Sequence, residues 1–208
     1  IPFRIGEVLP GLTIIGPVAA ITAIVFMRLM IYLGSIPKKL EIKPWQAPIV
    51  AGLLCGFFGM FFDEILGLGT NTLMLVITTE QAPLYLIALL VGKLFLTSAC
   101  IGFGFFGGTF SPALFLGGIV GALIFQLPFI DLSPELLSVL AVAGMAAVSS
   151  SVIGAPITAI ILVLELTGSY EYAIAATFPI VICSFITSKV FGNSLFDKQL
   201  ISRGVAIT

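Results

Sequence analysis

Residues 104–118 read Gly-Phe-Phe-Gly-Gly-Thr-Phe-Ser-Pro-Ala-Leu-Phe-Leu-Gly-Gly and interrupt an apolar run, residues 81–130, whose only charge is Lys93. The glycines at 104, 107 and 108 let the backbone bend and approach another group closely. Pro112 suits the first turn of a helix, where its missing N–H costs nothing. The stretch therefore predicts a glycine-rich loop that opens a new helix.

The expected helix covers residues 112–126 and would be roughly 22 Å long. The hydrocarbon core of a bilayer is about 30 Å thick, so this helix does not cross it alone. Irregular backbone at membrane depth needs protein or water around it. Because the N–H groups of Thr109 and Phe110 lie at the positive end of a helix, we expect an anion to bind there.

Composition identifies a membrane protein. Hydrophobic residues make up 59% of the chain, charged residues 9%, and the mean hydropathy is +1.23. A net charge of −1 argues against a nucleic-acid partner, and the lack of histidine removes histidine-based metal sites and acid–base chemistry. Since the sequence begins Ile-Pro, without Met or a signal peptide, we expect it to be part of a longer chain.

The apolar runs are uneven in length, and glycine or proline interrupts several of them. They cover residues 9–33, 46–62, 72–77, 84–102, 112–126, 136–152, 156–167 and 172–192. A polar loop is expected at 34–44, with Trp45 as an interfacial anchor. Discontinuous helices are typical of transporters and channels. We therefore predict an all-α polytopic membrane protein with short, tilted and broken helices.

Basic residues indicate the orientation in the membrane. Lys38, Lys39 and Lys43 form one cluster, and Lys189, Lys198 and Arg203 form a second, near the end of the chain. The positive-inside rule places both on the cytoplasmic side.

Three motifs carry a family resemblance. Residues 108–112, Gly-Thr-Phe-Ser-Pro, resemble the GxFxP signature of the CLC chloride channels and chloride/proton antiporters. Ala-Gly-Met-Ala-Ala at 143–147, followed by 154–168 with the run Ile-Leu-Val-Leu-Glu, is similar to the family segment ending in ILVLE-x-T. Residues 194–200, Ser-Leu-Phe-Asp-Lys-Gln-Leu, resemble the start of its last membrane helix. The resemblance covers nearly the whole chain.

The resemblance implies a fold and a function. Residues 1–193 would form the second inverted repeat of a CLC membrane domain, and residues 194–208 a final helix leading to the cytoplasm. The protein would transport chloride or similar anions, with protons in the antiporters, without a cofactor and not as an enzyme. We expect a homodimer in a bacterial inner membrane, with helices 156–167 and 173–191 at its interface. The gating glutamate and the inner-site serine belong to motifs that the sequence does not contain.

The resemblance also assigns an anion site. Thr109 and Phe110 would bind the anion through their backbone N–H groups. Gly107, Gly108, Ser111 and Pro112 would form the rest of the selectivity-filter loop. Relatives often have a tyrosine where this chain has Phe196, with its hydroxyl directed at the central chloride. Phe196 would thus approach the anion without that hydrogen bond.

Other polar residues in the apolar runs have two interpretations. Lys93 and Glu165 are intramembrane ionisable groups, for which a functional role is the default hypothesis. We favour a structural role for both. We expect the charge of Lys93 also to add some positive potential to an anion pathway. The serines at 149–151 could line a polar path, but more often such serines bond back to helix carbonyls. The three cysteines, at 55, 100 and 183, lie far apart in apolar runs and are interpreted as small buried residues.

Two alternatives to a CLC protein remain. One is a secondary transporter of another anion that also uses broken helices. The other is a membrane subunit that assembles without transporting. An enzyme has no support, because the sequence contains no nucleotide-binding loop, no Ser/His/Asp set and no metal-ligand cluster.

Overall fold

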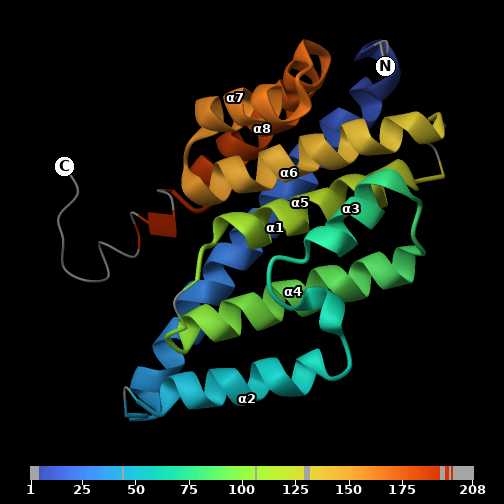
Figure 1. Ribbon diagram of the computed structural model, residues 1–208. Helices are drawn as coiled ribbons and strands as arrows, with labels where there is room; N and C mark the ends of the chain where they lie inside the picture. Colours follow the sequence, from blue (N-terminus) through green and yellow to red (C-terminus); the bar gives the residue numbers. More distant parts are fainter. Residues whose placement is uncertain are drawn as a thin grey trace.

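The computed structural model describes residues 5–43, 45–105, 107–128 and 132–192, together with Leu195, Phe196 and Lys198. All regular elements of this part are helical, which confirms the predicted all-α class (Figure 1). The helices are α1 (Ile5–Lys39), α2 (Ala47–Gly59), α3 (Thr70–Thr78), α4 (Pro83–Gly102), α5 (Phe110–Phe125), α6 (Leu137–Ile153), α7 (Pro156–Thr167) and α8 (Tyr170–Val190), with short 3-10 turns η1 (Asp63–Ile65) and η2 (Pro134–Leu136).

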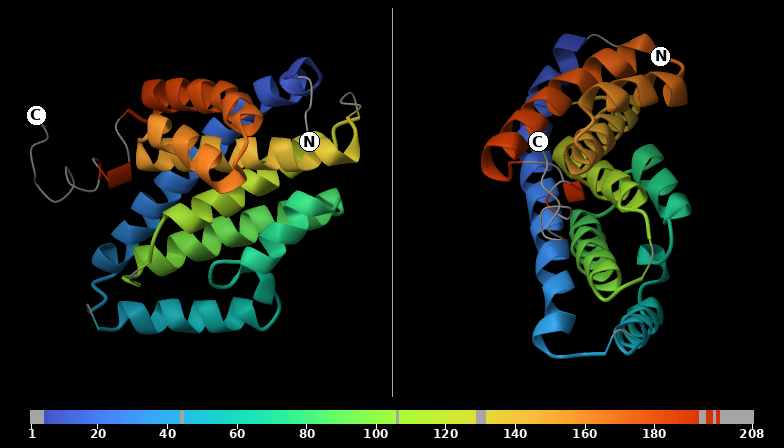
Figure 2. Two further views of the ribbon diagram at one scale, coloured as in Figure 1. Left: turned by 45° about the horizontal axis from the view of Figure 1, so that its top comes forward. Right: turned by 90° about the vertical axis from the view of Figure 1, so that its left-hand side faces the viewer.

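The helices lie in layers. From one side to the other they run from α7 and α8 through α6 and α5 to α4 and α2, with α1 crossing the layers obliquely (Figures 1 and 2). By length and composition, four helical segments of the described chain could cross a membrane, namely Gly6–Lys39, Pro83–Gly102, Pro134–Ile153 and Tyr170–Val190. Three further apolar helices, α2, α5 and α7, are shorter. The predicted mixture of spanning and short helices is therefore confirmed.

The loop predicted at residues 34–44 is partly wrong, because α1 continues to Lys39 and includes Pro37. The extension is held by packing. Ile36 contacts a small apolar cluster made by Ala47, Ala51 and Phe103. Tertiary contacts of this kind override the polar composition of the segment. At 35 residues, α1 is about 52 Å long, so it must run obliquely to fit a bilayer.

The closest helix pair is α5 with α6, and glycines make this approach possible. A Cβ on Gly117 would overlap the carbonyl oxygen of Gly144, and a Cβ on Gly121 would overlap that of Leu140. Small residues four apart let membrane helices pack backbone to backbone. The interface therefore fixes the position of α5, and with it the start of α5, where the predicted site lies.

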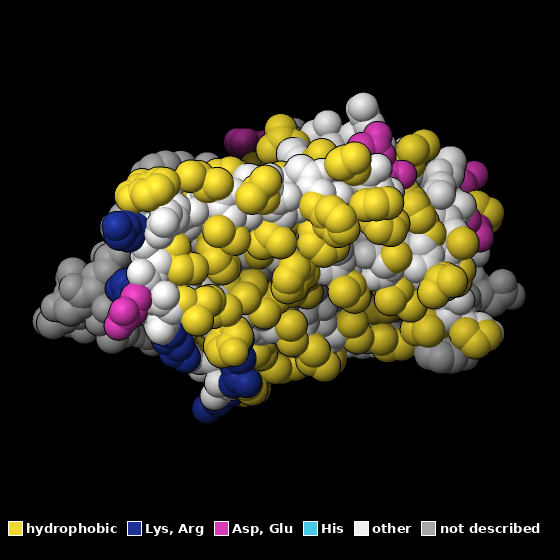
Figure 3. Space-filling view, turned by 90° about the horizontal axis from the view of Figure 1, so that it is seen from below, with side chains coloured by type: hydrophobic (Ala, Val, Ile, Leu, Met, Phe, Trp, Pro, Cys, Tyr) yellow, Lys and Arg dark blue, Asp and Glu magenta, His cyan; other side chains and the backbone are white. Residues whose placement is uncertain are grey.

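Charged side chains gather at the two ends of the helices. Glu7 and Glu171 lie in the first turns of α1 and α8, whereas Lys38, Lys39 and Lys189 lie in their last turns. These two helices run in the same direction (Figure 2). In the space-filling view, Lys and Arg lie at one edge of an apolar surface, with acidic side chains mostly at the other (Figure 3). Lys and Arg gathered on one side are what the positive-inside rule leads us to expect.

Candidate functional site

The start of α5 lies close to where the sequence predicts it. The helix begins at Phe110, so the predicted start at Pro112 is two residues late, although Pro112 does lie in the first turn. Thr109 is the N-cap residue, and its side chain makes no capping hydrogen bond. The first N–H groups of a helix have no acceptor within the helix, so they point outward as donors.

The glycines of the loop differ in what they contribute. Gly104 has a φ of 97°, in the region that favours glycine, whereas Gly107 and Gly108 are not among the residues with positive φ. A Cβ on Gly108 would meet no atom within 4 Å. Of the three glycines predicted to let the backbone bend, Gly104 is therefore the one whose φ requires glycine. Gly108 leaves open space beside the loop, whereas a Cβ on Gly107 would lie 3.8 Å from the Ile101 side chain.

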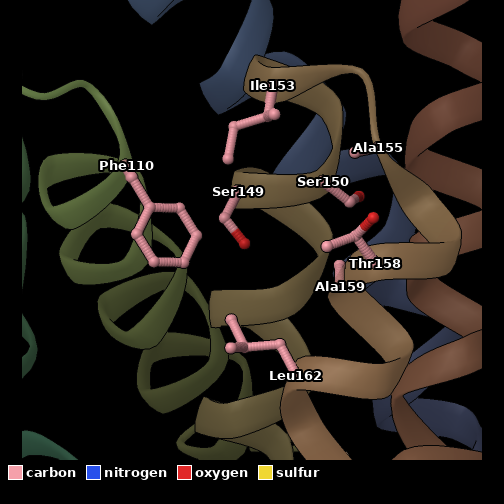
Figure 4. A pocket seen from close by; sticks show the side chains of 8 residues that line it. All are labelled: Phe110, Ser149, Ser150, Ile153, Ala155, Thr158, Ala159 and Leu162. Carbon is pink, nitrogen blue, oxygen red and sulfur yellow. The ribbon is translucent and has the colours of Figure 1, made fainter.

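A pocket of about 260 Å³ lies beside the start of α5. It is lined by Phe110, by three residues of α6 and by four residues in α7 or at its N-cap: Ser149, Ser150, Ile153, Ala155, Thr158, Ala159 and Leu162. The Phe110 ring points toward Ser149 across this space (Figure 4). Both α5 and α7 begin at the pocket, so two positive helix ends contribute to its potential.

Two of the three serines at 149–151 bond back to helix carbonyls as we favoured, whereas the Ser151 hydroxyl instead pairs with the Cys183 sulfur of α8 at 3.0 Å. The Ser149 hydroxyl donates to the carbonyl oxygen of Met145 at 2.7 Å, and the Ser150 hydroxyl donates to that of Ala147 at 2.9 Å. A serine hydroxyl has one proton to donate, and in Ser149 and Ser150 that proton is donated to a helix carbonyl, so it is not available to an anion. The backbone N–H groups and the Thr158 hydroxyl are thus the donors that remain for an anion next to Phe110.

Phe196 is not brought to this pocket. Its side chain is 45% exposed, and it does not belong to the lining. Leu195, Phe196 and Lys198 are helical, but most of the predicted final helix at 194–208, including Arg203, lies outside the described residues. The proposed role of Phe196 at the anion stays a prediction.

Lys93 takes a structural role, as favoured from the sequence. Its side chain is 1% exposed, and its ammonium donates to the carbonyl oxygens of Ile65 and Gly67 at 3.0 and 2.7 Å. The same ammonium lies 4.9 Å from the centre of the Phe115 ring on α5. Lys93 therefore connects α4 to the turn at η1 and to α5. The sequence did not reveal these partners, because they are backbone atoms brought together only by folding.

Glu165 lies exposed near the end of α7. Among the residues that the structure describes, no group of three or more His, Cys, Asp or Glu side chains could hold a metal ion. The features gathered at the start of α5 are thus helix ends, a glycine-rich loop and an aromatic ring.

Comparisons with known proteins agree on one family. The family described as voltage gated chloride channel matches residues 4–188. The voltage-gated ClC-type chloride channel ClcB of Escherichia coli is 29% identical over 169 residues, which is 80% of this chain and 40% of ClcB. The H(+)/Cl(−) exchange transporter ClcA of Vibrio parahaemolyticus is 31% identical over 163 residues, 74% of this chain and 34% of ClcA.

A solved structure has the same fold. The crystal structure of a slow cyanobacterial Cl−/H+ antiporter superimposes with a TM-score of 0.73 at 21% identity, covering 98% of this chain and 48% of the antiporter. The chain spans less than half the length of these relatives. The family match extends over most of the multi-pass helical structure described above, and the chain belongs to the voltage gated chloride channel family, the CLC proteins.

Proposed function

We propose that this chain forms part of the pathway of a transmembrane transporter or channel for chloride or similar small inorganic anions. One observation carries the proposal: α5 begins at Phe110, after a glycine-rich loop, with uncapped backbone donors beside an open pocket. The names of the relatives, a chloride channel and chloride/proton exchangers, support the same function.

The anion would lie in front of the N–H groups of Thr109 and Phe110. A full negative charge in a medium of low dielectric constant needs hydrogen-bond donors around it, because burying an ion without them is strongly unfavourable in free energy. Partial charges at a helix end suit transport, since an ion that is held too tightly cannot leave. Lys93 fits this arrangement, because its charge is held by two carbonyl groups and is not free to trap the anion.

The resemblance extends the proposal to the rest of the assembly. The chain would be the second inverted repeat of the membrane domain, with its basic helix ends in the cytoplasm of a bacterium. The protein would be an inner-membrane homodimer, and protons would be the counter-ion if it is an antiporter. Exposed apolar side chains along α7 and α8 support the interface, among them Ile157, Ile161, Val181 and Phe185.

The test is anion flux through the full-length protein in liposomes, with Gly108→Val as the variant. A valine there meets no protein atom at its Cβ, so we expect the fold to be kept while the stiff, bulky side chain restricts the backbone next to Thr109 and Phe110. Gly56→Val on α2 is the matched control, because its Cβ also meets open space. We expect chloride flux in the wild type and in Gly56→Val, and its loss in Gly108→Val.

Two results would contradict the proposal. Flux of Gly108→Val equal to that of the wild type would show that the loop is only a turn. If the wild-type protein carries organic anions but no small inorganic ones, or carries no anion at all, the function is one of the two alternatives raised by the sequence.

A further inference from the structure

A second pocket, of about 180 Å³, lies between α2, α4 and the turn after η1. Its lining includes Cys55 from α2 and Cys100 from the last turns of α4, and the thiol of Cys100 interacts with that of Cys55. Folding therefore brings to one pocket two cysteines that lie far apart in the sequence. Both are half-buried, whereas Cys183 is buried.

A positive charge lies on the wall of the same pocket. Lys93 lines it, and its ammonium interacts electrostatically with the Cys55 thiol. Thiol–disulfide exchange proceeds through a thiolate, and a neighbouring cation stabilises the negative charge on sulfur during the attack. We take Cys55 as the thiol that attacks first and Cys100 as the thiol that resolves the intermediate.

We propose that Cys55 and Cys100 form a reversible thiol–disulfide pair whose oxidant is a small disulfide such as oxidised glutathione. The Cys55 thiolate, having lost its proton to solvent, attacks one sulfur of the reagent and releases one glutathione thiolate, which takes up a proton. Cys100, after losing its own proton, attacks the Cys55 sulfur of the mixed disulfide and releases the second glutathione in the same way. Two electrons pass from the cysteines to the reagent, and excess reduced glutathione reverses both steps.

The bridge would join α2 to the end of α4, which leads into the glycine-rich loop. Gly107 and Gly108 line the same pocket, so the bridge lies on the wall that faces the loop. We expect oxidation to slow anion flux by holding this wall fixed. This consequence rests on the proposed function, whereas the thiol chemistry does not.

The first experiment measures the thiol chemistry on the intact protein in detergent. The protein is treated with oxidised glutathione, and free thiols and disulfide-linked peptides are identified by mass spectrometry. We expect a bridge between the peptides that contain Cys55 and Cys100, formed in the wild type and in the control Cys183→Ser. We expect no bridge in Cys55→Ser or Cys100→Ser. If both thiols stay free in folded wild-type protein, or if each carries only glutathione, the pair is refuted.

The second experiment measures chloride flux in liposomes before oxidation, after oxidation and after reduction. We expect a severalfold decrease on oxidation in the wild type, reversed by reductant and absent in Cys100→Ser. A bridge that forms without changing flux would overturn the regulatory consequence alone. A protein that carries no anion would refute the proposed function, and the peptide analysis would still decide the thiol pair.

Discussion

Gly117 of α5 lies against the backbone of Gly144 of α6 so closely that a Cβ on Gly117 would overlap the carbonyl oxygen of Gly144. Backbone carbonyl groups cannot rotate away as a side chain can, so the two helices would have to separate to admit even a methyl group. This contact positions the first turn of α5 relative to α6, whose Ser149 and Ser150 line the pocket beside Phe110. The candidate site thus depends on glycines that do not touch it.

The first prediction concerns this contact. Gly117→Ala should destabilise the protein by about 1–3 kcal/mol, the usual cost of overpacking a well-packed core. Gly56→Ala is the matched control, since its Cβ meets open space within α2. That change should be neutral or stabilising by up to about 1 kcal/mol, because alanine favours a helix over glycine. Denaturant unfolding in detergent compares them, and equal stability of the two variants would contradict the close approach.

The second prediction concerns the buried ammonium. Lys93→Met removes the donor for the carbonyl groups of Ile65 and Gly67. Unpaired buried acceptors cost about 1–3 kcal/mol, so the variant should unfold earlier by that amount. Lys39→Met, at an exposed position at the end of α1, should stay within about 0.5 kcal/mol of the wild type. Equal unfolding midpoints for the two variants would exclude the structural role of Lys93.

The third prediction concerns orientation. In a variant without the native cysteines, a cysteine at Lys39 or Lys189 should resist an impermeant thiol reagent added outside intact cells. Both positions belong to basic helix ends, which the positive-inside rule places in the cytoplasm. A cysteine at Glu171, in the first turn of α8, should be labelled. Labelling of Lys39→Cys without labelling of Glu171→Cys would reverse the topology.

The fourth prediction concerns assembly. Ile161 is 51% exposed on α7, whereas Ile160 packs against the core of its own chain. Ile161→Trp should therefore weaken the proposed homodimer by overpacking its interface without disturbing the fold. Leu84→Trp is a control on α4, on the other side of the molecule from α7 (Figures 1 and 2). Single-molecule counting in lipid measures the effect, and a monomeric wild-type protein would disprove the assembly.

The fifth prediction concerns the last segment. Phe196→Tyr should restore the hydroxyl that relatives offer to the anion, and tighten chloride binding by about 1 kcal/mol, the usual worth of one hydrogen bond. Phe185→Tyr, on an exposed part of α8, should leave binding unchanged. Calorimetry on the full-length protein compares the two. Equal affinities would show that residue 196 does not reach the anion.

Much of the fold could be predicted from the sequence because hydrophobic runs with interruptions are a local signal. The run at 156–167 and the helix α7 have the same bounds, and the run at 84–102 differs from α4 by one residue. Pro83, Pro156 and Gly168 mark helix ends through their own backbone preferences. The hydropathy pattern gave a wrong prediction at residues 34–39: it indicated a loop, whereas α1 continues through this polar segment.

The sequence by itself determined the membrane class, the uneven helices, the family resemblance and the glycine-rich opening of α5, because each follows from the order of residues along the chain. The spacing of Gly117 and Gly121 could also have indicated the close interface with α6, through the small-xxx-small pattern. Only the tertiary structure decided which groups meet. It bound the Lys93 ammonium to two carbonyl oxygens, brought Cys55 and Cys100 to one pocket, and placed Phe110 beside the start of α7. These contacts join residues far apart in the chain, and their partners are set by helix packing, which local sequence does not encode.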